Sequence, residues 1–433
     1  MQQQKPLYIR RASQLVTLAD SSNAPLRGKA MERLSIIENG SVWVEDGTIR
    51  AAGPDEEIAA KYQTRMNEAE VIDASGRLVT PGLVDPHTHL VYAGSRENEF
   101  EKRLRGATYM EIMAAGGGIH ATTAATREAS IEQLISESTR RLDLFLQQGV
   151  TTVEAKSGYG LSLEHELKQL EAAKELDRSH VVDVVSTFMG AHAVPAAYRE
   201  RPEVFVDQVV TEMIPEVARR KLAEFNDVFC ERGVFTPEQS RRILEAGKKY
   251  GLAPKIHADE IEPYGGAELA AEVGAVSADH LLRASKTGIQ AMAEAGVVAV
   301  LLPGTAFFLM AEAADGRNMI DAGVPVALST DCNPGSSPTV SLSLIMNLGC
   351  LKMGMTPAEV LTATTINAAH AIRRGHEIGS IEEGKKADLV LYDVPDYRSL
   401  QYAYGVNHAR TVIKSGCVAV RDGFPVHSRK AVS

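Results

Sequence analysis

The sequence predicts an α/β protein in which a closed (β/α)8 barrel, similar to a TIM barrel, carries a smaller β-rich domain. Two observations lead to this prediction. Between about residues 78 and 370, short β-rich runs alternate eight times with segments of helical periodicity, whereas both ends of the chain carry short alternating segments and turn signals. The barrel takes about 250 residues, so a chain of 433 residues has room for one more small domain.

The eight β-rich runs are the expected barrel strands. They lie at residues 78–89, 151–156, 181–190, 227–231, 253–257, 275–280, 297–303 and 324–331. The stretches between them, such as 131–148 and 237–250, place apolar residues at helical spacing. An open doubly wound sheet would show a similar alternation, and the pattern alone does not exclude it, but eight repeats favour the closed barrel.

The two ends of the chain are expected to form the smaller domain. Residues 41–53 are typical of a hairpin with Asp46 and Gly47 at its turn, and residues 387–393 and 412–423 are typical of strands. The predicted domains are therefore 1–77 with 368–433, and the barrel at 78–367.

Composition and charge exclude several classes of protein. Apolar residues make up 44% of the chain and charged residues 24%, as in ordinary globular proteins. The net charge of −10, without a basic cluster among aromatic residues, argues against a nucleic-acid partner. No apolar run approaches the roughly 18 residues that span a membrane, and the N-terminus lacks the apolar core of a signal peptide. With four widely spaced cysteines, the sequence predicts a cytoplasmic protein without a membrane partner.

His or Asp residues occur at four of the expected strand ends. His87 and His89 end the first run, His257 the fifth, His280 the sixth and Asp331 the eighth. Residues two apart on a strand point the same way, and the carboxyl ends of barrel strands meet at one face. A His-x-His pair by itself is a weak signal, and a single histidine at a strand end is more often structural. Agreement between four strands favours a metal site.

The donor set indicates which ion and which chemistry to expect. His87, His89, His257 and Asp331 suit one divalent ion per chain, Zn2+ or Fe2+. Such an ion lowers the pKa of a bound water toward neutrality and makes a hydroxide nucleophile available. Glu260 and His280 then remain for proton transfer and for orienting water and substrate.

These residues resemble the amidohydrolase superfamily over essentially the whole chain. The resemblance rests on Pro-Gly-Leu-Val-Asp-Pro-His-Thr-His at residues 81–89, and on His257, His280 and Asp331. It implies that the β-rich ends form a composite β-sandwich. Many members carry a carboxylated lysine on the fourth strand that bridges two metals. Here the fourth run has no lysine and Lys156 ends the second run, so we expect a mononuclear site, with Lys156 in a structural or supporting contact.

Longer segments resemble one family within this superfamily, the imidazolonepropionases. They lie at residues 94–101, 105–118, 154–160, 188–195 and 329–336. The resemblance implies a homodimeric hydrolase that opens the ring of 4-imidazolone-5-propanoate to N-formimino-L-glutamate in histidine degradation. The alternatives are a deaminase of a cyclic amidine or purine-type ring, and a catalytically silent scaffold. The scaffold is less favoured because all four ligand candidates are present.

The substrate has a small ring and a carboxylate tail. Arg96 can hold such a tail through two parallel hydrogen bonds, although an ion pair with Glu97 or Glu99 is the simpler alternative. The other expected substrate contacts are Tyr159, His192, Glu260, Asn333, Gly335 and Ser336. For Tyr159 the structural alternative is loop packing, for His192 an ordinary strand-end histidine, and for Asn333, Gly335 and Ser336 an ordinary turn.

Three residues are expected to act on the reacting atoms. Asp331 takes the proton of the attacking water, and Glu260 passes a proton to the departing ring nitrogen. His280 helps to stabilise the negative charge that develops on the carbonyl oxygen.

Overall fold

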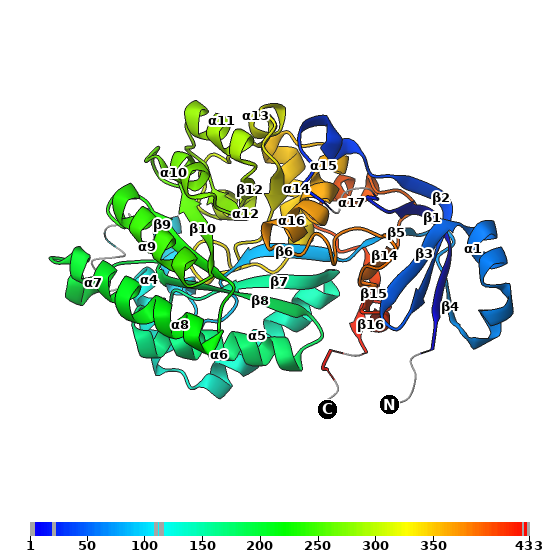
Figure 1. The fold of residues 1–433 in the computed structure, drawn as a ribbon, viewed down its shortest axis with the longest axis horizontal. Helices are drawn as coiled ribbons and strands as arrows, with labels where there is room; N and C mark the ends of the chain where they lie inside the picture. Colours follow the sequence, from blue (N-terminus) through cyan, green and yellow to red (C-terminus); the bar gives the residue numbers. More distant parts are fainter. Residues whose placement is uncertain (1–4, 20–22, 108–110, 112–116, 427, 431–433) are drawn as a thin grey trace.

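The computed structural model describes residues 5–19, 23–107, 111, 117–426 and 428–430, and in these residues it contains two β-sheets (Figure 1). One sheet has eight parallel strands, and the other has nine strands drawn from both ends of the chain. In Figure 1 the blue strands β1 to β3 lie beside the orange and red strands β14 to β16, at one end of the molecule.

The eight-stranded sheet is the predicted barrel. Its strands are β6 (Leu83–Thr88), β7 (Val150–Lys156), β8 (Asp183–Ala191), β9 (Phe225–Cys230), β10 (Ala253–Ala258), β11 (Ser277–His280), β12 (Val298–Leu301) and β13 (Val326–Leu328). Each pairs with its sequence neighbour, from β6 to β13. Beyond β13 the chain returns to β6, because the Asp331 amide donates to His87 O at 3.1 Å and the His89 amide donates to Cys332 O at 3.0 Å. The closed barrel is confirmed, and the open sheet is excluded.

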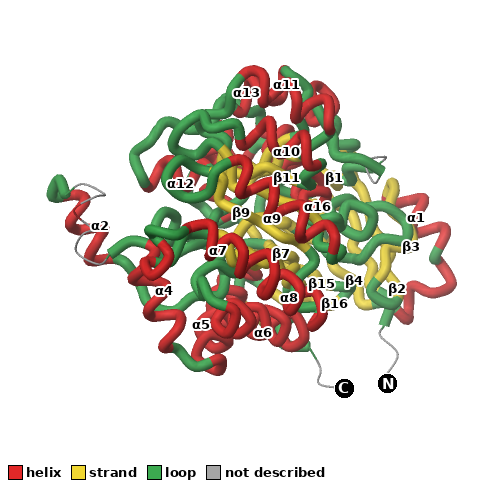
Figure 2. Tube along the Cα trace, turned by 60° about the vertical axis from the view of Figure 1, so that its left-hand side comes forward, coloured by secondary structure: helices red, strands yellow, loops and turns green. Residues whose placement is uncertain are grey.

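Helices surround these strands, as Figure 2 shows in red around yellow. They are α4 (Ile119–Glu128), α5 (Ile131–Gln147), α6 (Leu163–Ser179), α7 (Pro202–Gln208), α8 (Ile214–Arg220), α9 (Pro237–Lys249), α10 (Gly266–Val273), α11 (Lys286–Ala295), α12 (Pro303–Phe308), α13 (Gly316–Asp321), α14 (Leu342–Met353) and α15 (Pro357–Ala363). The strong amphipathic pattern of segments such as 131–147 and 237–249 buries one stripe of each helix against the strands.

Helix α16 (Ile366–Ala371) packs against the barrel strands, although the predicted domain boundary at 367/368 runs through it. Ala368, Ala369 and Ile372 share an apolar cluster with Val84 of β6 and Phe225 of β9. Helix α16 contacts β6, β12 and β13. Since β6 and β13 are the first and last strands of the sheet, α16 packs where the barrel closes. The division of the chain into domains at residues 77/78 and 367/368 stays a prediction.

The run at residues 78–89, expected as one barrel strand, is divided in two at Gly82. Strand β5 (Leu78–Pro81) belongs to the nine-stranded sheet, and only β6 belongs to the barrel. A β-carbon on Gly82 would stand 2.4 Å from Oγ1 of Thr151, so glycine permits a close approach to β7 at this point. Two strands in different sheets can read as one apolar run, since both are fully buried.

The nine-stranded sheet joins the two ends of the chain. Its strands are β1 (Leu7–Val16), β2 (Ile36–Glu45), β3 (Thr48–Pro54), β4 (Glu70–Asp73), β5, β14 (Leu389–Tyr392), β15 (Ala409–Lys414), β16 (Cys417–Arg421) and β17 (Phe424–Pro425). Strand β14 pairs antiparallel with β5, and Leu389 and Leu391 share a buried cluster with Leu7, Ile9 and Val42. The smaller domain therefore has one core built from both termini.

The expected hairpin at residues 41–53 is present as β2 and β3, which pair antiparallel. Its turn residues Asp46 and Gly47 have φ angles of 49° and 73°. Positive φ at both turn positions is typical of the tight hairpin turn that Asp-Gly favours.

The other α-helices of the described residues are α1 (Asp55–Lys61), α2 (Glu97–Leu104) and α17 (Ser399–Tyr402). Helical turns of other types lie at Gly28–Glu32, Gln63–Glu68, Ala196–Tyr198 and Val209–Met213.

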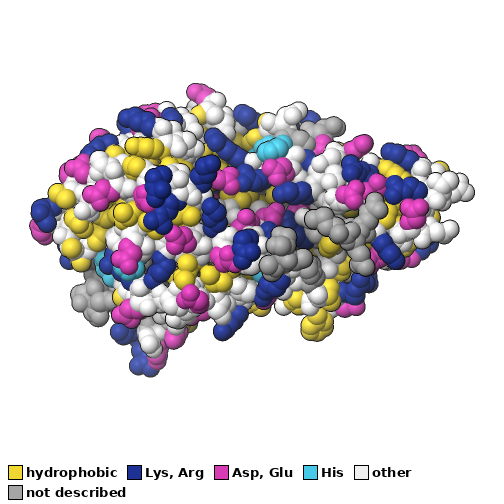
Figure 3. All heavy atoms as spheres, turned by 60° about the horizontal axis from the view of Figure 1, so that its bottom comes forward, with side chains coloured by type: hydrophobic (Ala, Val, Ile, Leu, Met, Phe, Trp, Pro, Cys, Tyr) yellow, Lys and Arg dark blue, Asp and Glu magenta, His cyan; other side chains and the backbone are white. Residues whose placement is uncertain are grey.

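The surface carries charges of both signs. On the face shown in Figure 3, Lys and Arg side chains are interspersed with Asp and Glu side chains rather than gathered by sign. Within the described ranges, every helix is too short or too polar to cross a bilayer.

Candidate active site

His87 and His89 lie at the carboxyl end of the first barrel strand, and both are buried. His87 is in β6 and fully buried, and His89 follows β6 and is 3% exposed. Their ring centroids are 5.6 Å apart. The two-residue spacing on an extended strand thus brings both imidazoles to the same side, as the sequence predicts.

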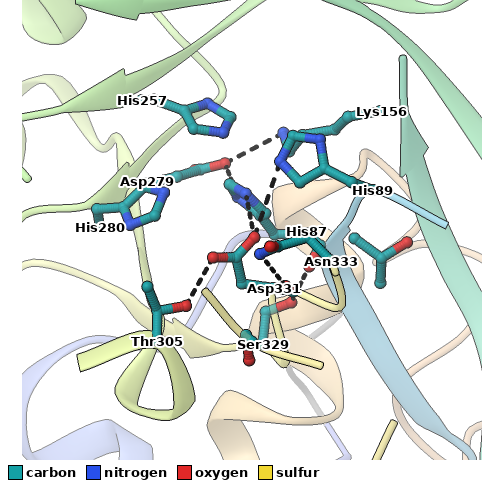
Figure 4. A network of polar contacts seen from close by, with 12 residues as sticks. His87, His89, Lys156, His257, Asp279, His280, Thr305, Ser329, Asp331 and Asn333 are labelled. Atoms are coloured by element: carbon teal, nitrogen blue, oxygen red, sulfur yellow. Dashed lines mark hydrogen bonds and ion pairs between the residues drawn. The ribbon is translucent and has the colours of Figure 1, made fainter. Parts of the chain in front are cut away.

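His257 and His280 lie opposite this pair (Figure 4). The centroid of the His87 ring is 4.5 Å from that of His257 and 5.4 Å from that of His280. One ligand atom from each of these three histidines fits within a cluster whose members are all within 4.8 Å of one another. Closure of the barrel therefore gathers residues that are nearly 200 positions apart in sequence.

Asp331 approaches the first pair from the eighth strand. Its Oδ1 lies 3.5 Å from Nε2 of His87 and 3.7 Å from Nε2 of His89, and Oδ2 accepts a hydrogen bond of 2.6 Å from Thr305 Oγ1. Burial raises the pKa of Asp331 to about 7, against weaker opposing hydrogen bonds. His87 is shared by this cluster and the previous one, so the predicted ligands His87, His89, His257 and Asp331 form one continuous group.

Two buried carboxylates orient the histidine rings. Oδ2 of Asp279 lies 2.6 Å from Nδ1 of His87, and Oδ1 of Asp227 lies 3.1 Å from Nδ1 of His257. Since an ionised carboxylate only accepts hydrogen bonds, each Nδ1 carries the proton and each Nε2 keeps its lone pair. In the described part of the chain, Nε2 of His87 and of His257 is buried without a hydrogen-bond partner.

These unpaired atoms fit a metal ion. A buried polar atom without a partner carries a free-energy cost of about 1–3 kcal/mol, which coordination would remove. Burial and the charge of Lys156 hold the pKa of His87 well below 6.5, and burial together with the neighbouring histidines and Lys156 does the same for His89 and His257. Neutral imidazole is the form that binds metal, and the Nδ1 contacts of His87 and His257 leave their Nε2 atoms for it.

Glu260 and His280 lie beside this group. Glu260 lies in the loop that follows β10, and its Oε1 is 3.6 Å from Nδ1 of His280. Burial and the nearby charges of Asp331 and Glu231 raise the pKa of Glu260 to about 8, which favours its protonated form. His280 and Asp331 have positive φ angles of 76° and 51°, which are uncommon for residues other than glycine. Such backbone conformations concentrate at functional sites.

Arg96 immediately precedes α2, its side chain is 17% exposed, and its Nε donates to Oε2 of Glu99 at 3.0 Å. The ion pair with Glu99, considered as the simpler alternative, is therefore present, while both Nη atoms face Gly335. Part of the neighbouring segment 105–118 lies outside the described residues. The role of Arg96 as a substrate contact stays a prediction.

Tyr159 and His192 line the same region as His89. The ring centroids of Tyr159 and His192 lie 5.5 and 4.8 Å from that of His89. Nδ1 of His192 is 3.1 Å from the Gly158 carbonyl, and burial lowers the pKa of His192 to about 4. Both predicted contacts are thus gathered at the site in a neutral, buried environment.

The turn after Asp331 uses its polar groups internally. Oδ1 of Asn333 accepts from the amides of Gly335 and Ser336 at 2.8 Å, and Nδ2 of Asn333 donates to Asp331 O and to Ser336 Oγ. This turn geometry is the structural alternative named for these residues. Their assignment as substrate contacts stays a prediction.

Several residues that shape the site were not identified from the sequence. Asp227 and Asp279 orient His257 and His87, Thr305 binds Asp331, and Lys255 is buried among the carboxylates. Lys156, for which the sequence predicts a structural or supporting contact, is buried with them. A signal was present, because charged residues interrupt otherwise apolar barrel strands. It does not tell which charged side chains meet.

Comparisons with known proteins agree with this arrangement. Residues 78–422 match the model of the amidohydrolase family. The imidazolonepropionase of Brevibacillus brevis is 73% identical over 97% of this chain and 99% of its own length, and that of Geobacillus sp. strain WCH70 is 74% identical with the same coverage.

Among solved structures, a triazine hydrolase variant has a TM-score of 0.73 at 17% identity and covers 97% of this chain and 96% of its own. A mutant atrazine chlorohydrolase of Arthrobacter aurescens, complexed with zinc and atraton, has a TM-score of 0.69 at 18% identity, with 97% and 96% covered. At such identities the likeness shows the fold alone.

Proposed function

The chain belongs to the amidohydrolase family, its close relatives are imidazolonepropionases, and on this premise we propose that it hydrolyses 4-imidazolone-5-propanoate to N-formimino-L-glutamate. It is a hydrolase that acts on a C–N bond of a cyclic amide. The observation that carries the proposal is the identity of 53–74% to imidazolonepropionases over 95–97% of this chain. The reaction is a step in histidine degradation.

One divalent ion, Zn2+ or Fe2+, would be held by His87, His89, His257 and Asp331. The orphaned Nε2 atoms and the buried Asp331 carboxylate support this assignment. When bound, the ion supplies Lewis acidity and lowers the pKa of a bound water toward neutrality.

A single ion is favoured over a pair by the surroundings of Lys156. Its Nζ lies within 3.2 Å of carboxylate oxygens from Glu154, Asp227 and Asp279. A carboxylated lysine would place a further negative charge against these three carboxylates. Lys156 as an ammonium group instead offsets part of their charge, so it is unsuited to bridge two metals.

The substrate's carboxylate tail requires a local positive charge, because the chain as a whole carries −10. Arg96 would supply that charge, with its Nε paired to Glu99 and both Nη atoms beside Gly335 in the turn that follows Asp331. Tyr159 and His192 would contact the ring or tail from the side of His89, with Glu260, Asn333, Gly335 and Ser336 as the remaining predicted contacts.

The side chains then move protons as the ring opens. Water adds through its oxygen to the ring carbonyl carbon, and Asp331 takes the water proton. Glu260, whose raised pKa favours the protonated form, delivers a proton to the departing ring nitrogen, while His280 stabilises the charge on the carbonyl oxygen. The C–N bond breaks, leaving a carboxylate at the carbonyl carbon and a formimino group on the other nitrogen.

The test is incubation of the metal-loaded protein with 4-imidazolone-5-propanoate, following the loss of imidazolone absorbance with and without a chelator. We expect ring opening that the chelator abolishes, without release of ammonia. Ammonia release would favour the deaminase alternative, and a metal-loaded protein that opens no ring would refute the proposal.

The cytoplasmic location and the homodimer remain part of the proposal. The homodimer predicts a mass near twice 46.7 kDa in light scattering of the purified protein.

A further inference from the structure

Lys156 lies where three buried carboxylates converge. It ends β7, and its side chain is fully buried. Its Nζ is 2.7 Å from Oδ2 of Asp227, 3.0 Å from Oε1 of Glu154 and 3.2 Å from Oδ2 of Asp279. Three barrel strands thus meet at one ammonium group.

Two of these carboxylates are the groups that orient the histidines. Asp279 uses the same Oδ2 to accept from His87 Nδ1, and Asp227 uses its other oxygen, Oδ1, to accept from His257 Nδ1. Figure 4 shows Asp279 between Lys156 and His87. Lys156 therefore reaches two predicted ligands of the ion through one intervening carboxylate each.

Without Lys156, Asp227 and Asp279 would lose the contact at Nζ that fixes the orientation of each carboxylate. A carboxylate that rotates away no longer presents its oxygen to the histidine Nδ1. A histidine freed of that contact loses its fixed tautomer and ring orientation, on which metal affinity depends.

We propose that Lys156 is a positioning residue that holds Asp227 and Asp279 in place through its contacts with their carboxylate oxygens, and so directs Nε2 of both His257 and His87 at the metal ion. The inference rests on the proposed metal site. It assigns to this lysine a role in ligand orientation rather than in bridging metals or in contacting substrate.

Lys255 provides an internal comparison. It is equally buried and lies in the neighbouring strand β10, but its Nζ pairs with Glu154 Oε2 at 2.7 Å and with the carbonyls of Pro86 and Ala371 at 3.4 and 3.2 Å. Its hydrogen bonds thus go to neither orienting carboxylate. Loss of Lys255 should reduce stability but leave in place the hydrogen bonds from Nδ1 of His87 and His257 to Asp279 and Asp227.

The experiment compares Lys156→Met with two matched controls, Lys255→Met and Lys414→Met. Lys414 is a buried lysine far from the site, paired with Asp388 at 2.6 Å and Asp183 at 2.9 Å. The metal-free proteins are titrated with Co2+, and both the dissociation constant and the visible absorption spectrum of the bound ion are measured. Thermal unfolding of each metal-free protein records its stability separately.

We expect Lys156→Met to bind Co2+ about 10–100-fold more weakly, with an altered spectrum, as is typical when outer contacts of metal ligands are lost. Both controls should keep the affinity within about threefold and retain the spectrum, even where they lower stability. A folded Lys156→Met protein with the affinity and spectrum of the unmodified chain would overturn the inference, and so would equal losses in all three variants.

A second pair of variants covers the case in which Lys156→Met does not fold. Asp227→Asn and Asp279→Asn keep the lysine and the side-chain volume, and each should weaken Co2+ binding and change the spectrum. Unchanged binding in both would overturn the inference. If the unmodified protein itself bound no Co2+, the proposed function would fail instead, so the two failures are distinguishable.

Discussion

Gly335 lies so close to the guanidinium group of Arg96 that a β-carbon on residue 335 would stand 2.0 Å from Nη1. Non-bonded heavy atoms pack at roughly 3.5–4 Å, so any larger residue at 335 must displace Arg96. The contact joins the segment that follows β6 to the turn that follows β13. It therefore couples a predicted substrate contact to the Asp331 turn.

The first prediction follows from this contact. Gly335→Ala should move Arg96 and raise KM about 10-fold or more, with a smaller change in kcat, because we propose that Arg96 holds the tail through charge-assisted hydrogen bonds. Steady-state kinetics measure the effect. Gly53→Ala is the control, since its β-carbon would meet only ordinary contacts from 3.6 Å. An unchanged KM in Gly335→Ala would show that the position of Arg96 is unimportant.

The second prediction concerns Arg96 itself. Arg96→Ala should raise KM by about 10–100-fold, corresponding to the 1.5–3 kcal/mol of a hydrogen bond to a charged group. Arg105→Ala removes another arginine close to α2, whose partner Glu101 is exposed, and should leave KM unchanged. If both variants behave alike, the tail contact must be reassigned.

The third prediction concerns Glu260. Glu260→Gln should lower kcat by about 10²–10⁴-fold, because it removes a general acid while preserving side-chain size. Metal content should stay the same, as Glu260 is outside the predicted ligand set. Near-normal turnover with metal bound would remove Glu260 from the proton transfer.

The fourth prediction concerns metal removal. Dialysis against a chelator should abolish ring opening, and Zn2+ or Fe2+ added back should restore it at one ion per chain. Metal analysis of the restored protein measures the stoichiometry. Two tightly bound ions per chain would contradict the mononuclear site and the ammonium state of Lys156.

The fifth prediction concerns stability in acid, through His180. This histidine is buried, with Nε2 3.1 Å from Asp143 Oδ1 and Nδ1 accepting from the Val182 amide. Burial lowers its pKa from 6.5 to about 4. Between these values the unfolded chain binds a proton that the folded chain does not, so the contribution to stability is present above pH 6.5 and is lost as pH falls toward 4.

The measurement is urea unfolding at several pH values between 7 and 4. The free energy of unfolding should fall by up to about 3 kcal/mol more in the unmodified chain than in His180→Gln. The site histidines contribute equally to both proteins and cancel in the comparison. His376→Gln, at an exposed position, should follow the unmodified chain. Parallel pH profiles for all three would contradict the role of His180.

Much of the fold follows from local patterns. Eight strand positions agree with the structure to within a few residues at most ends, because alternation and helical spacing record which side of each element is buried. The division at Gly82 was missed because β5 and β6 are both wholly buried and differ only in the sheet they join. Nothing in the local pattern records that difference.

By itself, the sequence predicted eight alternating strands that favour a closed barrel, the contribution of both termini to a second domain, and the histidine and aspartate residues at the strand ends. These features depend on periodicity and on residues at identifiable strand ends. The structure decided that the barrel closes, through the return of the chain from β13 to β6. Only the tertiary structure decided that Asp279 orients His87, that Asp227 orients His257 and that Lys156 lies between the two carboxylates. Those contacts join side chains from four or more strands, and their pairing depends on how the strands are staggered when the barrel closes.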